Sequence, residues 1–174
     1  HVGKAVENVV QGFSSDRLRV PLMASFMFNG GFTFFTTFFG VYLRNNFKFS
    51  SGKTGDYFAI VGLFIAFAQA VLVGRVSRKL TDYKVLRFSM FGNATMMMYF
   101  FLVPHSFSLG LYLGVPFFTA FNGLTMANMS SLVSRSAAMG QQGQAMGIYS
   151  SVQNLAQVPA AVLVGYITSS TVSY

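Results

Sequence analysis

Four long stretches without a charged side chain constrain this chain more than any other feature of its sequence. They cover 20–43, 57–74, 88–134 and 136–174. A helix needs about 20 predominantly apolar residues to cross the roughly 30 Å hydrocarbon core of a bilayer. Only 9% of the residues are charged, whereas a soluble domain averages about 25%. The sequence therefore excludes an ordinary soluble domain and predicts a protein embedded in a membrane.

The four stretches predict five transmembrane helices. The third stretch is about twice as long as one crossing requires, and the break at Pro104-His105-Ser106 divides it in two. Pro21 opens the first stretch, which suits the first turn of a helix. Continuous apolar runs favour helices over barrel strands, which alternate polar and apolar residues. We predict an all-α polytopic helix bundle with spans at about 20–43, 57–74, 85–103, 107–133 and 144–168.

The basic residues of the short connections predict the orientation. Nine Lys and Arg lie before the first span, between the second and third, and between the fourth and fifth, whereas three lie on the opposite side. Cytoplasmic loops carry the excess of Lys and Arg, so the N-terminus is expected in the cytoplasm. The net charge of +8 does not predict a nucleic-acid partner, because the charges lie between apolar runs and not on a polar domain.

Uncharged polar side chains gather on one face of several predicted spans. Lipid cannot satisfy them, so they should face other helices or a wet cavity. Hydrogen bonding between helices explains any single residue about as well as a solute pathway does. The third span is nearly all Phe, Met, Leu and Tyr and is expected to face lipid. The polar residues are Ser25, Asn29, Thr33, Thr36 and Thr37 in the first span, Thr119, Asn122 and Thr125 in the fourth, and Ser150, Gln153, Asn154 and Gln157 in the fifth.

Acidic residues and histidines are absent from the predicted spans. None contains Asp or Glu, and both histidines lie outside them, so this chain is not expected to carry a proton across the membrane itself. No general acid, base or metal cluster can form at depth, and the lack of cysteine excludes disulfides and cysteine-based metal sites. We therefore expect no enzyme activity, no catalytic residue, no cofactor and no metal.

One connection resembles a motif of the major facilitator superfamily. The stretch AVLVGRVSRKLTDYKVL at 70–86 is similar to the second-half copy of the family's signature loop, in which a glycine at a helix end precedes basic residues. Gly74 and Arg75 match this pattern. Arg78 stands in place of the acidic residue and Thr81 in place of the second glycine.

The last predicted span carries a second resemblance. Its sequence QQGQAMGIYSSVQNLAQVPAAVLVGYI, with glycines at 143, 147 and 165 and with Asn154 and Pro159, is similar to the loop and eleventh helix of bacterial drug-efflux members, including the tetracycline-exporter branch. Together with helices resembling the seventh and eighth, the resemblance covers about 19–168. It implies that 1–19 is a cytoplasmic linker from a missing first half and that 20–174 is the C-terminal transmembrane half, an incomplete set of six helices.

The resemblance implies a secondary active transporter in the bacterial cytoplasmic (inner) membrane. It would move small organic molecules by alternating access, as a proton-coupled drug exporter whose coupling carboxylate lies in the missing half. Spans that lack charge and are rich in Phe and Met suit loosely specified apolar solutes. A symporter for a neutral solute and a non-transporting scaffold or partner half are the alternatives.

Three groups of residues receive roles from the resemblance, because the family's seventh and tenth helices line its cavity. The expected solute contacts are Asn29, Thr33, Phe34, Thr36, Phe38, Phe118, Phe121, Asn122 and Thr125. The expected contacts between the two halves are Gln69, Gln153, Asn154 and Gln157. The expected cytoplasmic gate loop contains Gly74, Arg75 and Asp82.

Overall fold

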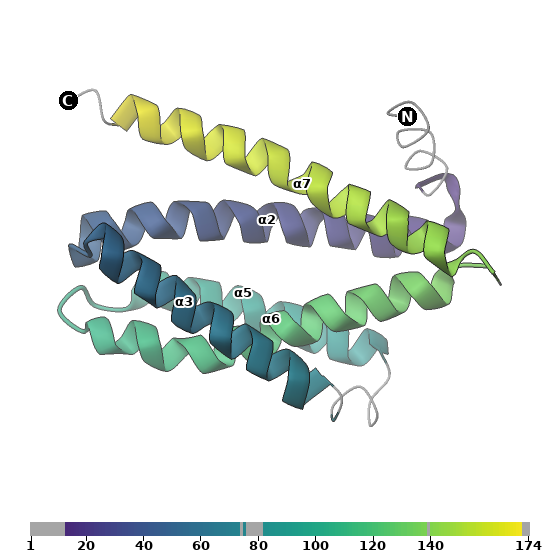
Figure 1. Cartoon of the computed structure of the whole chain (residues 1–174), viewed down its shortest axis with the longest axis horizontal. Helices are drawn as coiled ribbons and strands as arrows, with labels where there is room; N and C mark the ends of the chain where they lie inside the picture. The colour runs from purple at the N-terminus through teal and green to yellow at the C-terminus, as the bar shows by residue number, and fades with distance from the viewer. Residues whose placement is uncertain (1–12, 74, 76–81, 139, 172–174) are drawn as a thin grey trace. The chain divides into compact units, whose positions relative to one another are not determined.

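The fold is all-α, as the sequence predicts. The computed structural model describes residues 13–73, 75, 82–138 and 140–171, and no β-strand occurs among them. Figure 1 shows long helices joined by short connections. In chain order they are α2 (Asp16–Phe47), α3 (Ser51–Ala68), the π-helix η1 (Gln69–Val73), α5 (Asp82–Leu102), α6 (Ser108–Ser136) and α7 (Gln142–Thr171).

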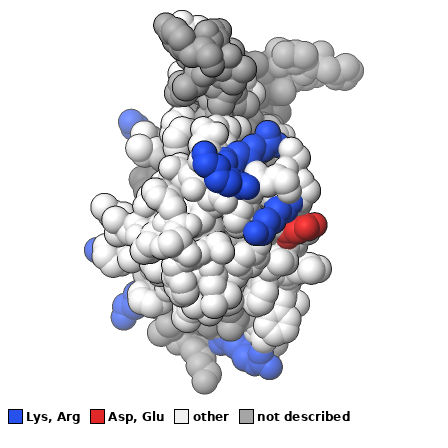
Figure 2. All heavy atoms as spheres, turned by 90° about the vertical axis from the view of Figure 1, so that its left-hand side faces the viewer, with Lys and Arg blue, Asp and Glu red and all other residues white. Residues whose placement is uncertain are grey.

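Three of these helices are long and apolar enough to cross a membrane: α2, the segment Ser51–Val71 and α6. They coincide with the first, second and fourth predicted spans. The predicted break between the third and fourth spans is confirmed, because α5 ends at Leu102 and α6 begins at Ser108. Helices α5 and α7 have 21 and 30 residues but lower hydropathy. Their crossing of the membrane therefore stays a prediction. Figure 2 shows Lys and Arg side chains at several places on one face of the molecule, separated by uncharged surface.

The expected position of Pro21 in a first helical turn is wrong. Helix α2 begins at Asp16, so that Pro21 lies inside it. The proline nitrogen has no hydrogen to donate to the carbonyl of Arg17, four residues earlier. Asp16 instead provides the acidic first turn, where a carboxylate interacts favourably with the helix dipole. The uncharged stretch marks the apolar part of the helix and not its beginning.

The described residues divide into two compact units, and α2 and α6 each contribute to both. The first unit comprises the chain up to Phe39 and from Ser130 onward, and the second comprises Gly40–Met129. The first unit therefore contains most of α2, the end of α6 and all of α7. The second contains the end of α2, helices α3 and α5, and most of α6.

Close contacts join α2 to α7 in the first unit (Figure 1). A Cβ atom placed on Gly30 would lie 3.3 Å from the backbone oxygen of Ala156. Five residues earlier on α2 and seven residues earlier on α7, the Tyr149 hydroxyl hydrogen-bonds the side chain of Ser25. Both of these side chains are buried. Small residues at a crossing let backbones approach closely, so Gly30 sets the separation of the two helices.

Glycine and hydroxyl groups also join α5 to α6 in the second unit. The Thr125 hydroxyl donates to Ser89 Oγ at 2.9 Å. A Cβ atom on Gly92 would lie 2.6 Å from the ring of Phe121, a separation that real Cβ atoms do not adopt. Only a glycine at 92 therefore admits this ring, and the contact fixes the register between the two helices.

Two asparagines lie one turn beyond this hydrogen bond. Asn93 follows Ser89 by four residues on α5, and Asn122 precedes Thr125 by three on α6, so antiparallel packing brings both to one level of the interface. Their exposed fractions are 1% and 3%. Within the described part of the chain, both polar atoms of the Asn93 side chain and Nδ2 of Asn122 have no hydrogen-bond partner. The interface thus contains buried polar groups that are not satisfied by protein.

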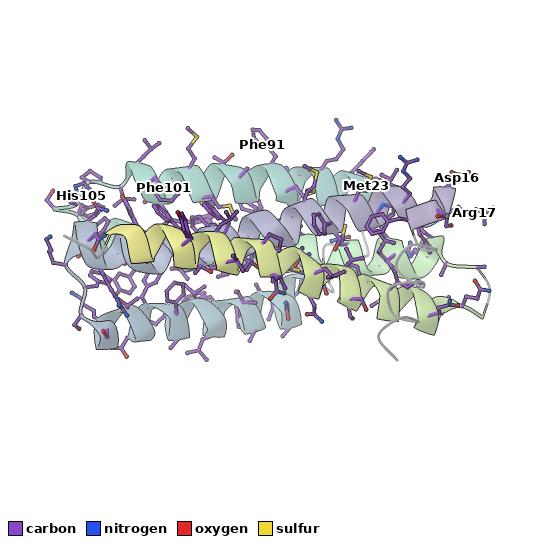
Figure 3. All side chains as sticks on the ribbon, turned by 90° about the horizontal axis from the view of Figure 1, so that it is seen from above. Asp16, Arg17, Met23, Phe91, Phe101 and His105 are labelled. Carbon is purple, nitrogen blue, oxygen red and sulfur yellow. The ribbon has the colours of Figure 1, made fainter. Side chains whose placement is uncertain are left out.

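The expectation that the third predicted span faces lipid holds for one side of α5 only. Phe91 is 75% exposed and points outward from the helix (Figure 3). Ser89 and Asn93 lie on the opposite, buried side against α6. Because three polar or small residues among many apolar ones suffice to build a helix contact, the overall composition of α5 did not reveal it.

The connection between α2 and α3 is a tight turn with one unusual backbone conformation. Lys48 has a φ of 55°, which is the left-handed region that follows many helix ends. Ser50 then caps α3, its side chain accepting a hydrogen bond from the backbone N–H of Lys53 at 3.2 Å. A non-glycine residue in the left-handed region costs roughly 1 kcal/mol.

Replacing Lys48 with glycine should therefore stabilise the protein by about 1 kcal/mol. Thermal unfolding in detergent, followed by far-ultraviolet circular dichroism, measures the effect as a higher midpoint. Arg44→Gly, in the last turn of the same helix, is the matched control and should lower the midpoint, because glycine costs about 1 kcal/mol inside a helix. A lower midpoint for Lys48→Gly would contradict the left-handed conformation.

The α5–α6 interface predicts opposite effects for two neighbouring substitutions. Asn93→Leu removes two buried polar atoms that have no partner. It should raise the unfolding midpoint, because leaving a buried polar group unpaired costs about 1–3 kcal/mol of stability. Ser89→Ala removes the bond from Thr125 and should lower it by an amount corresponding to roughly 0.6 kcal/mol. The same unfolding assay tests both. A decrease for Asn93→Leu would show that Asn93 is hydrogen-bonded in the folded protein.

Candidate functional site

The expected solute contacts on α2 lie on consecutive turns of its uncharged middle. Asn29 is buried, and its side-chain Nδ2 donates to the Ser25 carbonyl at 2.8 Å and to Ser25 Oγ at 3.2 Å. Thr33 and Thr36 are half-buried. The Thr36 hydroxyl donates to the carbonyls of Phe32 and Thr33, both at 3.1 Å. The Asn29 amide group and the Thr36 hydroxyl are thus held by hydrogen bonds within their own helix.

The aromatic residues expected to accompany them also share one side of α2. Phe34 and Phe38 have ring centroids 6.2 Å apart with nearly parallel planes. Phe34 is 40% exposed and Phe38 is half-buried. Thr33 lies about 100° from Phe34 around the helix axis, whereas Thr36 lies about 200° from both rings. Thr33 is therefore the hydroxyl group at the edge of the aromatic side, and Thr36 lies on the opposite side of the helix. We call Thr33, Phe34 and Phe38 the α2 surface.

The expected contacts on α6 pack mainly against α5. Phe118 is buried and meets the ring of Phe100 edge to face, with centroids 5.4 Å apart. Phe121 meets Phe88 in the same way at 5.6 Å. Thr125 is buried and holds its bond to Ser89. The α6 residues therefore form one cluster with α5.

The two groups of expected solute contacts belong to different units. Asn29 and the α2 surface lie in the first unit, and the α6 residues lie in the second. The structure brings together the members of each group. Each group by itself offers hydrogen-bonding groups, without a formal charge, beside aromatic rings.

The residues expected between the two halves differ in exposure. Gln69 is exposed and begins the π-helix η1. A Cβ atom on Gly123 of α6 would lie 3.5 Å from the Gln69 side chain, so α6 passes close to this turn. On α7, Asn154 and Gln157 are exposed, whereas Gln153 is half-buried and hydrogen-bonds Tyr149. A π turn interrupting an α-helix often occurs at a functional position.

The expected gate loop falls largely outside the described residues. Gly74 is among the residues not described. Arg75 is exposed, and its guanidinium donates to the Val71 carbonyl at 3.3 Å. Asp82 is the first residue of α5. The structure therefore does not test whether these three residues act together.

The sequence interpretation missed two buried polar residues and one tyrosine. Ser89 and Asn93 lie at the α5–α6 interface described above, and Tyr149 contacts Ser25 on α2. Ser89 and Asn93 are four residues apart, with Gly92 beside them. This spacing puts them on one helix face, and it is the signal that could have identified a helix contact within the otherwise apolar span.

Comparison with known proteins agrees with this architecture. No curated protein and no solved structure matches the chain. The family model described as Major Facilitator Superfamily matches residues 4–161, which include α2, α3, α5, α6 and most of α7. Since the match extends over most of the chain, this integral membrane protein belongs to the Major Facilitator Superfamily of transporters.

Proposed function

We propose that the chain is the C-terminal half of a transporter that exports small amphipathic organic molecules by proton-coupled alternating access. The observation that carries the proposal is the α2 surface. It places the Thr33 hydroxyl at the edge of the side that carries Phe34 and Phe38, in a helix whose segment 20–43 contains no charged residue. Hydroxyl groups and exposed rings suit a solute that is mostly apolar and carries a few polar atoms.

The α6 residues support the same site from a second position. Asn122 and Thr125 are buried beside α5, with Phe118 against Phe100. We propose that they hold the shape of the pathway and contact the solute less directly than the α2 surface does. The glutamines and asparagine at 69, 153, 154 and 157 are proposed to face the other half of the transporter, where polar contacts can exchange as the halves rock.

Proton coupling is assigned to residues outside this chain. Within the three candidate spans, the uncharged segments 20–43, 57–71 and 108–134 contain no Asp, Glu or His. A proton relay in a membrane normally requires one of these groups. The coupling carboxylate is therefore proposed to lie in the N-terminal half, and the half described here is proposed to bind the solute.

Direction and coupling can be measured in inside-out vesicles that contain the protein. An acidic vesicle interior should drive accumulation of an amphipathic fluorescent dye such as ethidium, because each entering dye exchanges with an outgoing proton. A protonophore should abolish the accumulation. Dye leaving the vesicles under the same gradient would indicate symport, and equal fluxes with and without a gradient would contradict coupling to protons. Vesicles without the protein are the control.

Thr33→Val tests the α2 surface, because it removes a hydroxyl and keeps the shape of the side chain. If the solute bonds this hydroxyl, the loss of about 1 kcal/mol should raise KM roughly fivefold with little change in the amount of inserted protein. Thr95→Val on the exposed side of α5 is the matched control, since the Thr95 hydroxyl bonds only its own helix, at 2.9 Å to the Phe91 carbonyl. Equal KM values for the two variants would remove Thr33 from the site.

A further inference from the structure

Two pairs of polar residues lie where α2 and α7 pack together in the first unit. Ser25 and Asn29 are four residues apart on α2, and Tyr149 and Gln153 are four residues apart on α7. Residues at this spacing share one helix face and lie one turn apart. The Tyr149 hydroxyl hydrogen-bonds the side chains of both Ser25 and Gln153. These four residues therefore form one hydrogen-bond network across the two helices.

The two amide side chains of the network lie at about the same level. From the hydroxyl contact between the helices, the close approach of Gly30 to Ala156 lies five residues further along α2 and seven further along α7. The two helices therefore run in the same direction here. Asn29 and Gln153 each follow the hydroxyl contact by four residues, so each helix carries one amide side chain a turn beyond the shared hydroxyl groups.

The hydrogen bonds of the network have a fixed direction at Asn29. Its Nδ2 group can only donate, and its acceptors are the Ser25 carbonyl at 2.8 Å and Ser25 Oγ at 3.2 Å. The Ser25 hydroxyl thus accepts from Asn29, which leaves its own hydrogen for Tyr149. The Asn29 amide is oriented with Nδ2 toward Ser25 and Oδ1 away from it. No hydrogen bond to this Oδ1 occurs among the described residues.

Water has little access to the network. The exposed fractions of Ser25, Asn29 and Tyr149 are 0%, 4% and 4%. Solvent does not replace the partner that a buried polar group loses, and hydrogen bonds that share a hydroxyl group strengthen one another. Removing one bond of the network should therefore loosen the orientation of the Asn29 amide, even where the lost bond does not involve Asn29 itself.

The network connects two groups of residues that have separate roles in the proposed function. Asn29 is one of the expected solute contacts, and it lies one turn before Thr33 and about 40° from it around the axis of α2. Gln153 is proposed to face the other half of the transporter. Ser25 and Tyr149 belong to neither group, and they provide the only bonds between Asn29 and Gln153 that the described residues show.

We propose that Tyr149 is a positioning residue that couples solute binding at Asn29 to the contact of Gln153 with the other half. The proposal rests on the proposed function, because it takes Asn29 as a solute contact. While Gln153 holds the Tyr149 hydroxyl, the network keeps Asn29 Oδ1 in place to accept a hydrogen bond from the solute. When the halves rock and Gln153 changes partner, the Asn29 amide loses its fixed orientation and the affinity for the solute falls.

Tyr149→Phe tests the proposal, because it removes the central hydroxyl and keeps the ring. The solute is ethidium, whose amino groups can donate to Asn29 Oδ1, and its uptake is measured in inside-out vesicles. The KM should rise about fivefold, which corresponds to the loss of one hydrogen bond, with the amount of inserted protein unchanged. Gln153→Leu should raise the KM as well, and it should raise it no further in combination with Tyr149→Phe.

Tyr99→Phe is the matched control. The Tyr99 hydroxyl donates to the Gly110 carbonyl at 3.1 Å in the second unit, so its removal also costs one hydrogen bond of a partly buried tyrosine. This variant should leave the KM for ethidium unchanged. An equal rise for Tyr99→Phe would overturn the proposal, because it would show that the loss of any such hydroxyl weakens transport.

A double-mutant cycle separates positioning from a general effect on the fold. In an Asn29→Leu background no amide remains to be oriented, so Tyr149→Phe should raise the KM no further. A second rise by the same factor would overturn the proposal, because Tyr149 would then act on the fold and not through Asn29. If Tyr149→Phe inserts poorly, Ser25→Ala breaks the same network at its other hydroxyl and gives the same comparison.

Failure of this proposal can be distinguished from failure of the proposed function. Wild-type protein that accumulates no ethidium would contradict the proposed function, and it would remove the solute contact on which the role of Tyr149 rests. Accumulation by the wild-type protein, together with an unchanged KM for Tyr149→Phe, would overturn the role of Tyr149 alone.

Discussion

A hydrocarbon environment supplies no hydrogen-bond partner, so every polar group of a membrane helix depends on the protein around it. Several hydroxyl groups in the described helices solve the problem locally. Thr36, Thr37 and Thr119 each donate to a carbonyl three or four residues earlier in the same helix. A hydroxyl satisfied in this way can still accept a hydrogen bond from another molecule. It can therefore serve a solute without leaving a buried group unpaired when the solute departs.

The same constraint separates the two possible roles of the polar helix faces. Thr125 donates across to Ser89 on α5 and so joins two helices. The Thr36 hydroxyl is satisfied along α2 itself. From sequence, hydrogen bonding between helices and lining of a pathway were equally good explanations for each residue, since both put Ser, Thr and Asn on one helix face. The choice depends on which partner lies opposite, and only the packed structure supplies that partner.

Patterns within one helix were predictable from the sequence, and contacts between helices were not. The uncharged segments predict the helical fold, and Pro104 with its neighbours predicts the end of α5, because both signals act through nearby residues. The start of α2 at Asp16 and the buried side of α5 at Asn93 escaped prediction for different reasons. Hydropathy marks where a chain is apolar and not where its helix begins, and an average composition conceals a contact built from Ser89, Gly92 and Asn93.

The π-helix at Gln69–Val73 has a consequence for the evolution of this segment. A π turn contains about one residue more than an α turn, because its hydrogen bonds join residues five apart. Removing one residue here would return the segment to an α-helical turn and leave α3, which precedes it, unchanged. Elsewhere in a helix, a one-residue deletion rotates everything beyond it by about 100° and moves buried side chains to the surface. The length of this one turn can therefore change by one residue while α3, which precedes it, keeps its packed face.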